Sequence, residues 1–522
     1  MKQSPFVRGL VIVLAATLIV GGLVFSNRIL AGDAFEKEEA QHALYGFWLW
    51  RDIQALDWGS FWHDTERQMY WPFLHSWILS SFFLVFGVSY VSARSLSLLF
   101  FVLSIIMLYA LSNKISEKSG WRIGIISALL MLTSPLMIKY ASLNMLEGLG
   151  SLLFLSCAYM YLQAEERKDL LHYLFLALLM SLSIYTNYIY AFLLIPAALF
   201  GTFADLGPIF YKAYELRKKG EKAAMQFAWW GYKKLISLAV VLALAGIWFS
   251  FSFFRKVTFF LDAIFKNWGG VMVNSVWEAV AYYPKVIIGQ ATFSPWLGGL
   301  LIFSLLLPFV AAHYQGLNKM FILVWAVLLL ITLTVTTKTP SMVYIVVPFM
   351  FLIFSATIVY FYDRFAAKNK KYAQALLLIV LLPALLSLPS TYRLYFPLRS
   401  GENMVQVLDY FRGSVPEDKS IAIILDHKRL NPEVVQFHFR GRAGEVLTDP
   451  RMAEERDLDE DCYFLTIEID EGSRYREGIK DDSLYQWNSW IWSSEMNGDI
   501  RFYSSRRFDG LGLTAKIFKF TP

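Results

Sequence analysis

Long apolar runs separated by short polar stretches dominate the chain up to about residue 390. A run of about 20 apolar residues can cross the hydrocarbon core of a bilayer as a helix. We predict about eleven spans, at 9–30, 91–113, 123–140, 148–163, 170–186, 188–210, 234–254, 296–314, 320–337, 341–361 and 373–390. We expect the first of these to be a retained span, because its apolar core is too long for a cleaved signal peptide.

The pattern changes after Pro397, where charged residues become frequent. "NMVQVLDYF" has the spacing of a helix, and short β-branched or aromatic runs predict strands. Those runs are "SIAIILD", "VVQFHF", "CYFLTIEI" and "LTAKIFKF". The fold class is therefore a polytopic α-helical membrane protein, with residues 1–390 in the membrane and an α/β domain at 391–522.

Basic residues orient the spans, because cytoplasmic loops are enriched in Lys and Arg. Lys2 and Arg8 place the N-terminus inside, so loop 31–90 and the C-terminal domain are expected to be extracytoplasmic. We expect 209–233 to form an amphipathic stretch on the inner surface. Segment 73–87 is short for a span and is expected to lie in the interface; if it crosses, every later loop changes sides.

Composition supports a membrane protein. The chain is 56% hydrophobic and 17% charged, with a mean hydropathy of +0.45, and a soluble protein of this size needs more polar surface. The net charge of +6 is accounted for by inner loops and does not indicate nucleic-acid binding. Cys157 and Cys462 have no metal-ligand spacing, and we expect no disulfide between them.

Under this topology, ionisable and amide side chains from distant loops meet the same membrane face. They are Glu38, Glu39, His42, Glu147, Asn187 and Lys338. Each alone is consistent with an ordinary charged residue at the end of a span. Together they predict a site at the outer surface of the bilayer.

The stretch "EKEEAQHALYGF" predicts an amphipathic helix. Glu38 and His42 are four residues apart and share a face, with Tyr45 one turn further on. The opposite face, which is expected to meet the membrane, is apolar and consists of Ala40, Ala43, Leu44 and Phe47. A carboxylate beside a low-dielectric surface can have a raised pKa and act as a general base. The alternative is a solvated acidic face.

"EEAQHAL" resembles the acidic motif that follows the first span of GT-C glycosyltransferases. The similar branches are the dolichyl-phosphate-mannose–protein mannosyltransferases and the aminoarabinose-lipid A transferases. Glu38, Glu39, His42 and Ala43 match that motif, with Glu38 where the family usually has an aspartate. Asp33 or Glu36 are the alternatives for that acid.

Further similarities follow in the same order along about residues 5–390. "YWPFLHSW…FGVSYVSAR" is similar to a family segment with two prolines, of which Phe73 replaces the second, followed by a Phe-Gly turn and Arg94. "LTSPLMIKYASLNMLEGLG" resembles the segment that ends in a second acid, here Glu147. "TKTPSMVYIVVPF" resembles a late span with Lys338, Tyr344 and Pro348.

The resemblance implies transfer of a sugar from a polyprenyl-phosphate carrier to an acceptor, with inversion at the sugar carbon. It implies Glu38 and Glu39 as catalytic residues, with Glu38 as general base. The implied substrate-binding residues are His42, Arg94, Glu147, Asn187, Lys338 and Tyr344. Lys338 would offset charge on the leaving phosphate, and His42 and Glu147 would orient the acceptor or bind a divalent ion.

No cofactor is required by this chemistry, although a divalent cation is compatible with it. The acceptor can be a lipid, a glycan or a protein, and the sugar is open. The alternative function is a lipid or glycan transporter or flippase without transferase activity; inverted repeats and ionisable residues deep in the spans are typical of that class, and we find neither. We expect a bacterial inner membrane, because the chain does not end in a retention signal for the endoplasmic reticulum.

Overall fold

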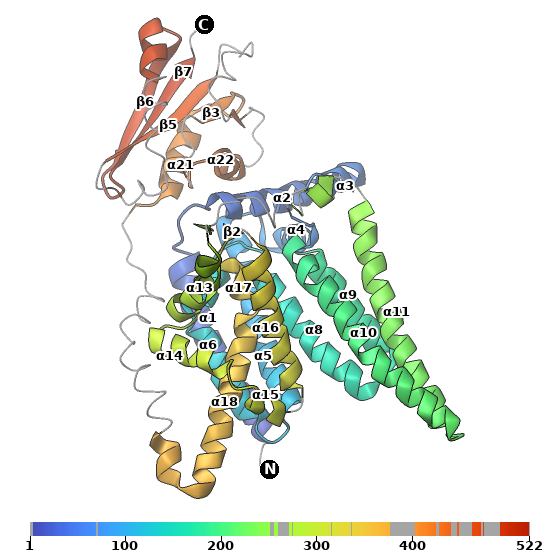
Figure 1. Cartoon of the computed structure of the whole chain (residues 1–522). Coiled ribbons are helices and arrows are strands. Elements are labelled where there is room, and N and C mark those ends of the chain that lie inside the picture. The colour runs from blue at the N-terminus through green and yellow to red at the C-terminus, as the bar shows by residue number, and fades with distance from the viewer. Residues whose placement is uncertain are drawn as a thin grey trace. The chain divides into compact units, whose positions relative to one another are not determined.

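The computed structural model forms two compact units (Figure 1). It describes residues 4–68, 71–250, 255–258, 261, 271–273, 275–314, 316–335, 337–375, 402–423, 427, 429–439, 446–447, 462–470, 473 and 491–520. The first unit contains Met1–Ile29, Trp58–Ile78 and Arg94–Phe396, and the second contains Leu30–Asp57, Leu79–Ala93 and Pro397–Pro522. Residues 30–57 and 79–93 thus pack with the C-terminal segment, whereas we expected the whole of 1–390 to form one domain.

Helices make up nearly all of the described chain before residue 376. In order they are α1 (Pro5–Val24), α2 (Lys37–Gln54), α3 (Trp58–Glu66), α4 (Leu74–Phe86), α5 (Tyr90–Ile115), α6 (Gly120–Leu132), α7 (Pro135–Ala141), α8 (Glu147–Arg167), α9 (Leu170–Ile184), α10 (Tyr188–Lys218), α11 (Ala223–Ser250), α13 (Val276–Val286), α14 (Pro295–Ser304), α15 (Pro308–His313), α16 (Leu317–Thr334), α17 (Ser341–Tyr344) and α18 (Val347–Lys368). Short π-helical turns extend α1 (Phe25–Ile29) and α13 (Ile287–Ala291), and strands β1 (Val271–Met272) and β2 (Thr337–Lys338) pair antiparallel.

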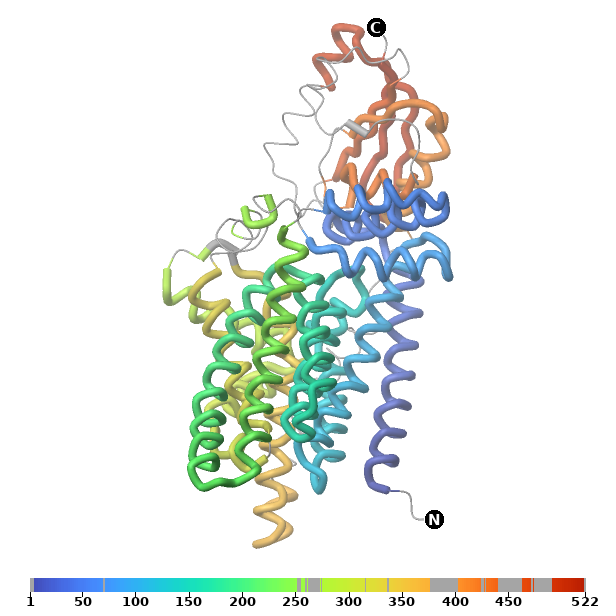
Figure 2. Tube along the Cα trace, turned by 90° about the vertical axis from the view of Figure 1, so that its right-hand side faces the viewer, coloured from blue at the N-terminus to red at the C-terminus, as the bar shows by residue number. Residues whose placement is uncertain are grey.

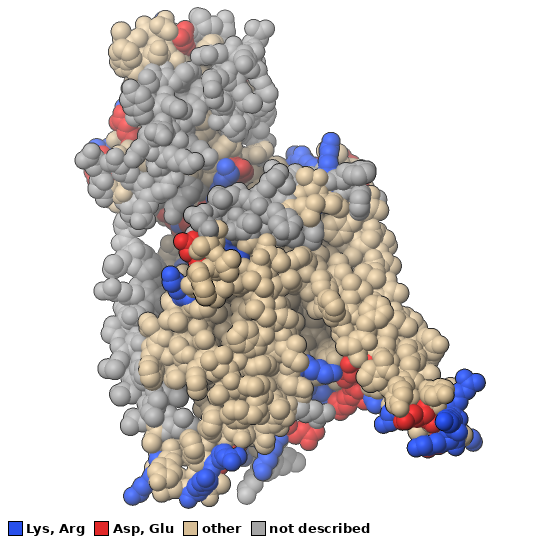
Figure 3. Space-filling model, viewed as in Figure 1, with Lys and Arg blue, Asp and Glu red and all other residues tan. Residues whose placement is uncertain are grey.

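Six helices are long and apolar enough to cross a membrane: α1 with its π-turn, α5, α10, α11, α16 and α18. The bent pair α6–α7 makes a seventh if it is counted as one span. The fold class is confirmed, but the count of eleven spans is not, and the predicted span 373–390 lies outside the described residues after residue 375. In Figure 3 the helices of the first unit show a broad surface without charged side chains, and charges gather at their lower ends.

Local sequence explains the break between α6 and α7. Pro135 is the first residue of α7, and the Ser134 hydroxyl caps that helix by accepting a hydrogen bond from the Met137 N–H at 3.3 Å. A proline fits the first turn of a helix but cannot continue the preceding one. The two helices are therefore bent by 68°.

The helix α18 is the centre of the first unit. Every residue from Val347 to Val359 is buried, as expected for a helix that is apolar on all sides. It packs against α6, α14 and α16, while α1 packs on α6 and α8 packs on α9.

Residues 209–233, which we predicted to form an amphipathic stretch on the inner surface, do not form a separate element. They lie instead in the ends of α10 and α11, which run side by side as a long antiparallel pair (Figures 1 and 2). Gly220 makes the reversal possible, because it adopts a φ of +73°, which a residue with a side chain rarely adopts. The Glu221 N–H then bonds the Leu216 carbonyl at 2.9 Å and closes the turn.

The second unit contains a five-stranded sheet in the order β4-β3-β5-β7-β6. Its strands are β3 (Ile421–Ile423), β4 (Val446–Leu447), β5 (Tyr463–Ile469), β6 (Ile500–Phe508) and β7 (Leu513–Phe520). β3 is parallel to β4 and β5, and β5, β7 and β6 are antiparallel neighbours. Helix α21 (Met404–Ser414) packs on β6 and β7, and α22 (Pro432–His438) packs on α2. The predicted α/β domain is therefore confirmed, with more strands than we expected.

One predicted strand, "VVQFHF", is wrong, because these residues form α22. The reason is local: Asn431 caps the helix by accepting a hydrogen bond from the Val434 N–H at 3.0 Å, and Pro432 is its first residue. Strand β6 was not predicted from the sequence because it is an edge strand of the sheet. Only its terminal residues, Ile500 and Phe508, are buried, so its sequence carries little apolar alternation.

The cap at Asn431 gives a stability prediction. Asn431→Ala removes both the bond from Val434 and the bond that the Asn431 amide donates to the His427 carbonyl at 3.3 Å. We expect unfolding free energy to fall by about 1–2 kcal/mol and the melting temperature of the purified chain to fall, as measured by scanning fluorimetry. N431D retains the capping oxygen and is expected to melt above N431A. Equal melting of the two variants would contradict this role for the cap.

Candidate functional site

The acidic motif occupies the first turn of α2, and its two glutamates have different environments. Glu38 is exposed, whereas Glu39 is buried at 1% exposure. A Glu39 carboxylate oxygen accepts a hydrogen bond from the Glu36 N–H at 3.1 Å, which is the geometry of a helix capping box. Glu39 therefore fixes the start of the helix, and the neighbouring Glu38 is an exposed residue of the same turn.

The other residues of the predicted polar face are not exposed. His42 and Tyr45 are buried, and the Tyr45 hydroxyl accepts a bond from the Gln41 amide at 3.1 Å. The opposite face, made of Ala40, Ala43, Leu44 and Phe47, is buried as well. The expectation that this face meets lipid is therefore corrected: protein covers it in the structure.

The two alternative acids, Asp33 and Glu36, are engaged by the C-terminal segment within the same unit. Asp33 accepts a hydrogen bond from the Met404 N–H at 2.7 Å, and Glu36 pairs with Arg429 at 3.0 Å. Carboxylates held in this way are less available to accept a substrate proton. Both alternative acids therefore have a structural role in holding the segment that precedes α2.

Glu147 is the first residue of α8, in the first unit, and it lies close to a group of tyrosines. Tyr344 is fully buried, and its ring lies 5.3 Å from that of Tyr140, edge to face. Helix α17, which ends at Tyr344, packs on α8, which begins at Glu147. Within the described residues the Tyr344 hydroxyl has no hydrogen-bond partner. The structure thus brings together two predicted site residues that are far apart in sequence.

Arg94 lies at the same end of the helices. It is 3% exposed in the first turns of α5, one helical turn before Ser97 and on the same face. The Ser97 hydroxyl accepts a hydrogen bond from the Met145 N–H at 3.4 Å, just before α8 begins. The face of α5 that carries Arg94 is therefore the face that contacts the turn before Glu147 through Ser97.

Lys338 is buried at 1% exposure in β2, where it pairs with Val271. Its ammonium donates to the carbonyls of Ile331 and Thr332 at 2.6 and 2.7 Å, and to that of Val335. A cation is favourable at a helix C-terminus, and three donors match three carbonyls. Burial nevertheless lowers the pKa of Lys338 to about 8. In this structure Lys338 caps α16, and its predicted role at the phosphate is a separate proposal.

Asn187 also has a structural contact. Its side-chain oxygen accepts a hydrogen bond from the Ile189 N–H at 3.0 Å, which caps the start of α10. The loop between α9 and α10 is thereby fixed. The predicted contact of Asn187 with substrate stays a prediction.

Sequence reasoning missed Lys256, a second buried lysine close to a helix end. Its ammonium lies 3.4 Å from the centre of the Trp248 ring and donates to the Trp248 carbonyl at 3.0 Å. Burial lowers its pKa to about 8, and the charge of Glu66 opposes this shift. Its sequence signal was weak, because a lysine in an aromatic loop is typical of an ordinary interfacial anchor.

The predicted site residues are divided between the two units. Those of the first unit are Arg94, Glu147, Asn187, Lys338 and Tyr344, and those of the second are Glu38, Glu39 and His42. The convergence of the two groups stays a prediction. No group of three or more metal-ligating side chains occurs among the described residues, and dependence on a divalent cation is untested.

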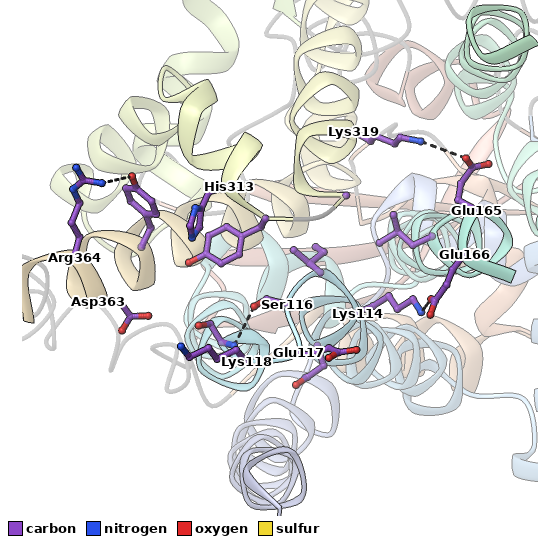
Figure 4. Close-up of a pocket in the computed structure, with 17 residues that line it drawn as sticks. Lys114, Ser116, Glu117, Lys118, Glu165, Glu166, His313, Lys319, Asp363 and Arg364 are labelled. Carbon is purple, nitrogen blue, oxygen red and sulfur yellow. Dashed lines mark hydrogen bonds and ion pairs between the residues drawn. The ribbon is translucent and has the colours of Figure 1, made fainter. Parts of the chain in front are cut away.

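A cavity of about 910 Å³ lies at the opposite ends of α5 and α8 from Arg94 and Glu147 (Figure 4). Lys114 of α5 pairs with Glu166 of α8, and Lys319 at the start of α16 lies 3.7 Å from Glu165. Arg364 of α18 also lines this cavity. All these helix ends were predicted to be cytoplasmic. The structure places them together, which is consistent with the prediction that they lie on one side of the membrane.

Residues 71–212 match the family model of dolichyl-phosphate-mannose-protein mannosyltransferase. Among solved structures, ArnT from Cupriavidus metallidurans in the apo state is 13% identical with a TM-score of 0.59, over 98% of both chains. The same ArnT bound to undecaprenyl phosphate is 13% identical with a TM-score of 0.56, over 97% of both chains. None of the curated proteins compared with this chain matches it.

A third similar structure is the archaeal oligosaccharyltransferase AglB from Archaeoglobus fulgidus, in complex with an inhibitory peptide and a dolichol-phosphate. It is 11% identical with a TM-score of 0.55, over 98% of this chain and 74% of AglB. Together these matches define a polytopic membrane protein with the GT-C fold. The predicted resemblance to GT-C glycosyltransferases is confirmed, and the matched family segment contains Arg94, Glu147 and Asn187.

The orientation of the chain can be tested by labelling single cysteines in intact and opened cells. Cys157 and Cys462 are buried, so their background labelling is expected to be low. We expect E38C to react with a membrane-impermeant maleimide in spheroplasts, and K118C, at the cavity end, to react only after the membrane is opened. Labelling of both positions from the same side would contradict the topology.

Proposed function

We propose that this protein transfers a hexosyl or pentosyl group from a polyprenyl-phosphate carrier to an acceptor at the extracytoplasmic face of the plasma membrane. The observation that carries the proposal is the fold match to ArnT bound to undecaprenyl phosphate, which covers 97% of both chains. The match of residues 71–212 to a mannosyltransferase family model supports the same class of donor. The acceptor can be a lipid, a glycan or a protein.

The proposed reaction proceeds by a single displacement at the anomeric carbon of the sugar. The acceptor hydroxyl attacks that carbon, and Glu38 takes the hydroxyl proton as general base. The bond between the anomeric carbon and the phosphate oxygen breaks, and polyprenyl phosphate leaves with the electron pair. One displacement inverts the configuration, as the single-step logic of inverting glycosidases also requires. Exposure of Glu38 at the start of α2 supports its assignment as base.

The leaving phosphate develops negative charge, which a fixed cation stabilises. Lys338 and Arg94 are the residues we assign to the phosphate, and both are buried. Glu147 and Tyr344 form a buried acid and hydroxyl that can bind sugar hydroxyls, and His42 orients the acceptor or a divalent ion. Glu39 acts by fixing the first turn of α2, which holds Glu38 in place.

The role of Glu38 predicts a loss of transfer in E38Q, because an amide cannot accept the proton. We expect the amount of glycoconjugate product to fall by about 100-fold or more. It is measured by mass spectrometry in a deletion strain that expresses either the wild-type protein or E38Q. E221Q, an exposed acid in the turn between α10 and α11, serves as control and is expected to have normal activity. Full transfer by E38Q at normal protein abundance would refute the assignment of Glu38 as the base. If the protein is a transporter, its deletion would lower the product in cells, but the purified wild-type protein would not turn over the donor in vitro.

The role of Lys338 predicts an alkaline limit to activity. With a pKa of about 8, the ammonium is mostly charged below pH 8 and mostly neutral above it, so turnover is expected to decline as pH rises through 8. K338R keeps the charge at all accessible pH values and should move this decline upward. K256R is the matched control, because Lys256 has a similar pKa. A decline that persists in K338R and disappears in K256R would assign it to Lys256 instead.

A further inference from the structure

The segment before α2 is held by the C-terminal part of the second unit. The Arg429 guanidinium donates to the Ala34 carbonyl at 2.7 Å and to a Glu36 carboxylate oxygen at 3.0 Å, and it lies 3.7 Å from a carboxylate oxygen of Asp33. Asp33 in turn accepts the hydrogen bond from the N–H of Met404, the first residue of α21. One guanidinium thus contacts three residues of the segment 33–36, which precedes the acidic motif.

An aromatic contact fixes the same segment from another side. Phe35 is fully buried, and its ring lies 4.4 Å from that of Tyr90 and 5.0 Å from that of Phe437 in α22. The Tyr90 hydroxyl lies 3.1 Å from the His438 imidazole, which also pairs with Asp409 at 3.1 Å. The segment is therefore packed between the start of α5 and the C-terminal helices by both apolar and polar contacts.

The backbone that presents Arg429 is itself closed. His427 and Leu430 exchange two backbone hydrogen bonds of 3.0 Å each, and the Arg429 N–H donates to the His427 imidazole at 3.1 Å. Asn431 then joins this turn to the start of α22. The backbone at Arg429 is therefore held by hydrogen bonds to His427.

Glu38 lies only two residues after Glu36, inside the same helical turn. The back-bond from Glu36 N–H to Glu39 ties the held segment to the first turn of α2. Displacement of Glu36 therefore displaces Glu38 through a rigid helix. A shift of about 1 Å in a catalytic group can lower a rate by about 100-fold.

We propose that Arg429 is a positioning residue through which the C-terminal domain sets the place of Glu38. This inference rests on the proposed function, because it assigns to the domain a role in the transfer step itself. A planar guanidinium can hold a carbonyl and a carboxylate at once, and an ammonium cannot reproduce that fork. Lysine at this position is therefore expected to be a poor substitute.

The experiment compares R429A, R429K and R412A in the full-length chain in lipid nanodiscs. Arg412 is an exposed arginine of α21 and serves as the matched control. With undecaprenyl-phosphate-linked mannose or aminoarabinose as the donor, we expect kcat to fall by about 10–100-fold in R429A, with the donor KM within two-fold of wild type. R429K is expected to fall between R429A and wild type, and R412A to match wild type.

Hydrogen exchange of the amides of residues 33–42 supplies a second readout that needs no turnover. We expect these amides to exchange faster in R429A than in R412A. Added guanidinium is expected to restore slow exchange and activity to R429A. It is not expected to restore activity to E38Q. Unchanged exchange in R429A, or faster exchange with unchanged kcat, overturns the positioning role. If the wild type shows no transfer with any donor, the proposed function fails, while the exchange data still decide whether Arg429 holds the segment.

Discussion

The constraint on which the first unit depends is the cost of an unsatisfied polar group away from water. Backbone groups inside a bilayer must bond within the protein, and a buried charge needs partners of its own. Helix ends supply those partners. Glu147 begins α8, where the helix dipole favours a negative charge, and Lys338 meets the carbonyls that end α16, where it favours a positive one.

In the second unit, the polar segment that precedes α2 is held in a defined position by contacts with the C-terminal part of the chain. The segment at Asp33–Glu36 has no regular structure of its own before α2 begins, yet it is fixed by an arginine fork and by a buried phenylalanine. Its partners come from a part of the chain almost 400 residues away. Under the role that we propose for Arg429, the C-terminal domain takes part in the transfer step by holding this segment.

Much of the fold could be predicted because long apolar helices and strands with buried apolar residues have strong local patterns. Helices α1, α5, α10, α16 and α18 follow the predicted spans, and α21, β3, β5 and β7 follow the apolar patterns of the tail. The errors have local causes too: Asn431 and Pro432 start a helix in a β-prone run, and β6 carries little apolar signal because it is an edge. Hydropathy also could not show that the region around Gly220 turns sharply between two long helices.

The sequence by itself determined the membrane class, the helical architecture and the order of the motifs, because each depends on the local pattern of apolar, charged and turn-forming residues. It also identified Glu147 and Tyr344 as separate candidates. Only the tertiary structure decided that these two meet, that Glu39 caps α2 while Glu38 is exposed, that Lys338 is bonded to the end of α16, and that Arg429 holds the acidic segment. Such pairings join residues distant in the chain, and no local pattern specifies which side chains share a buried space.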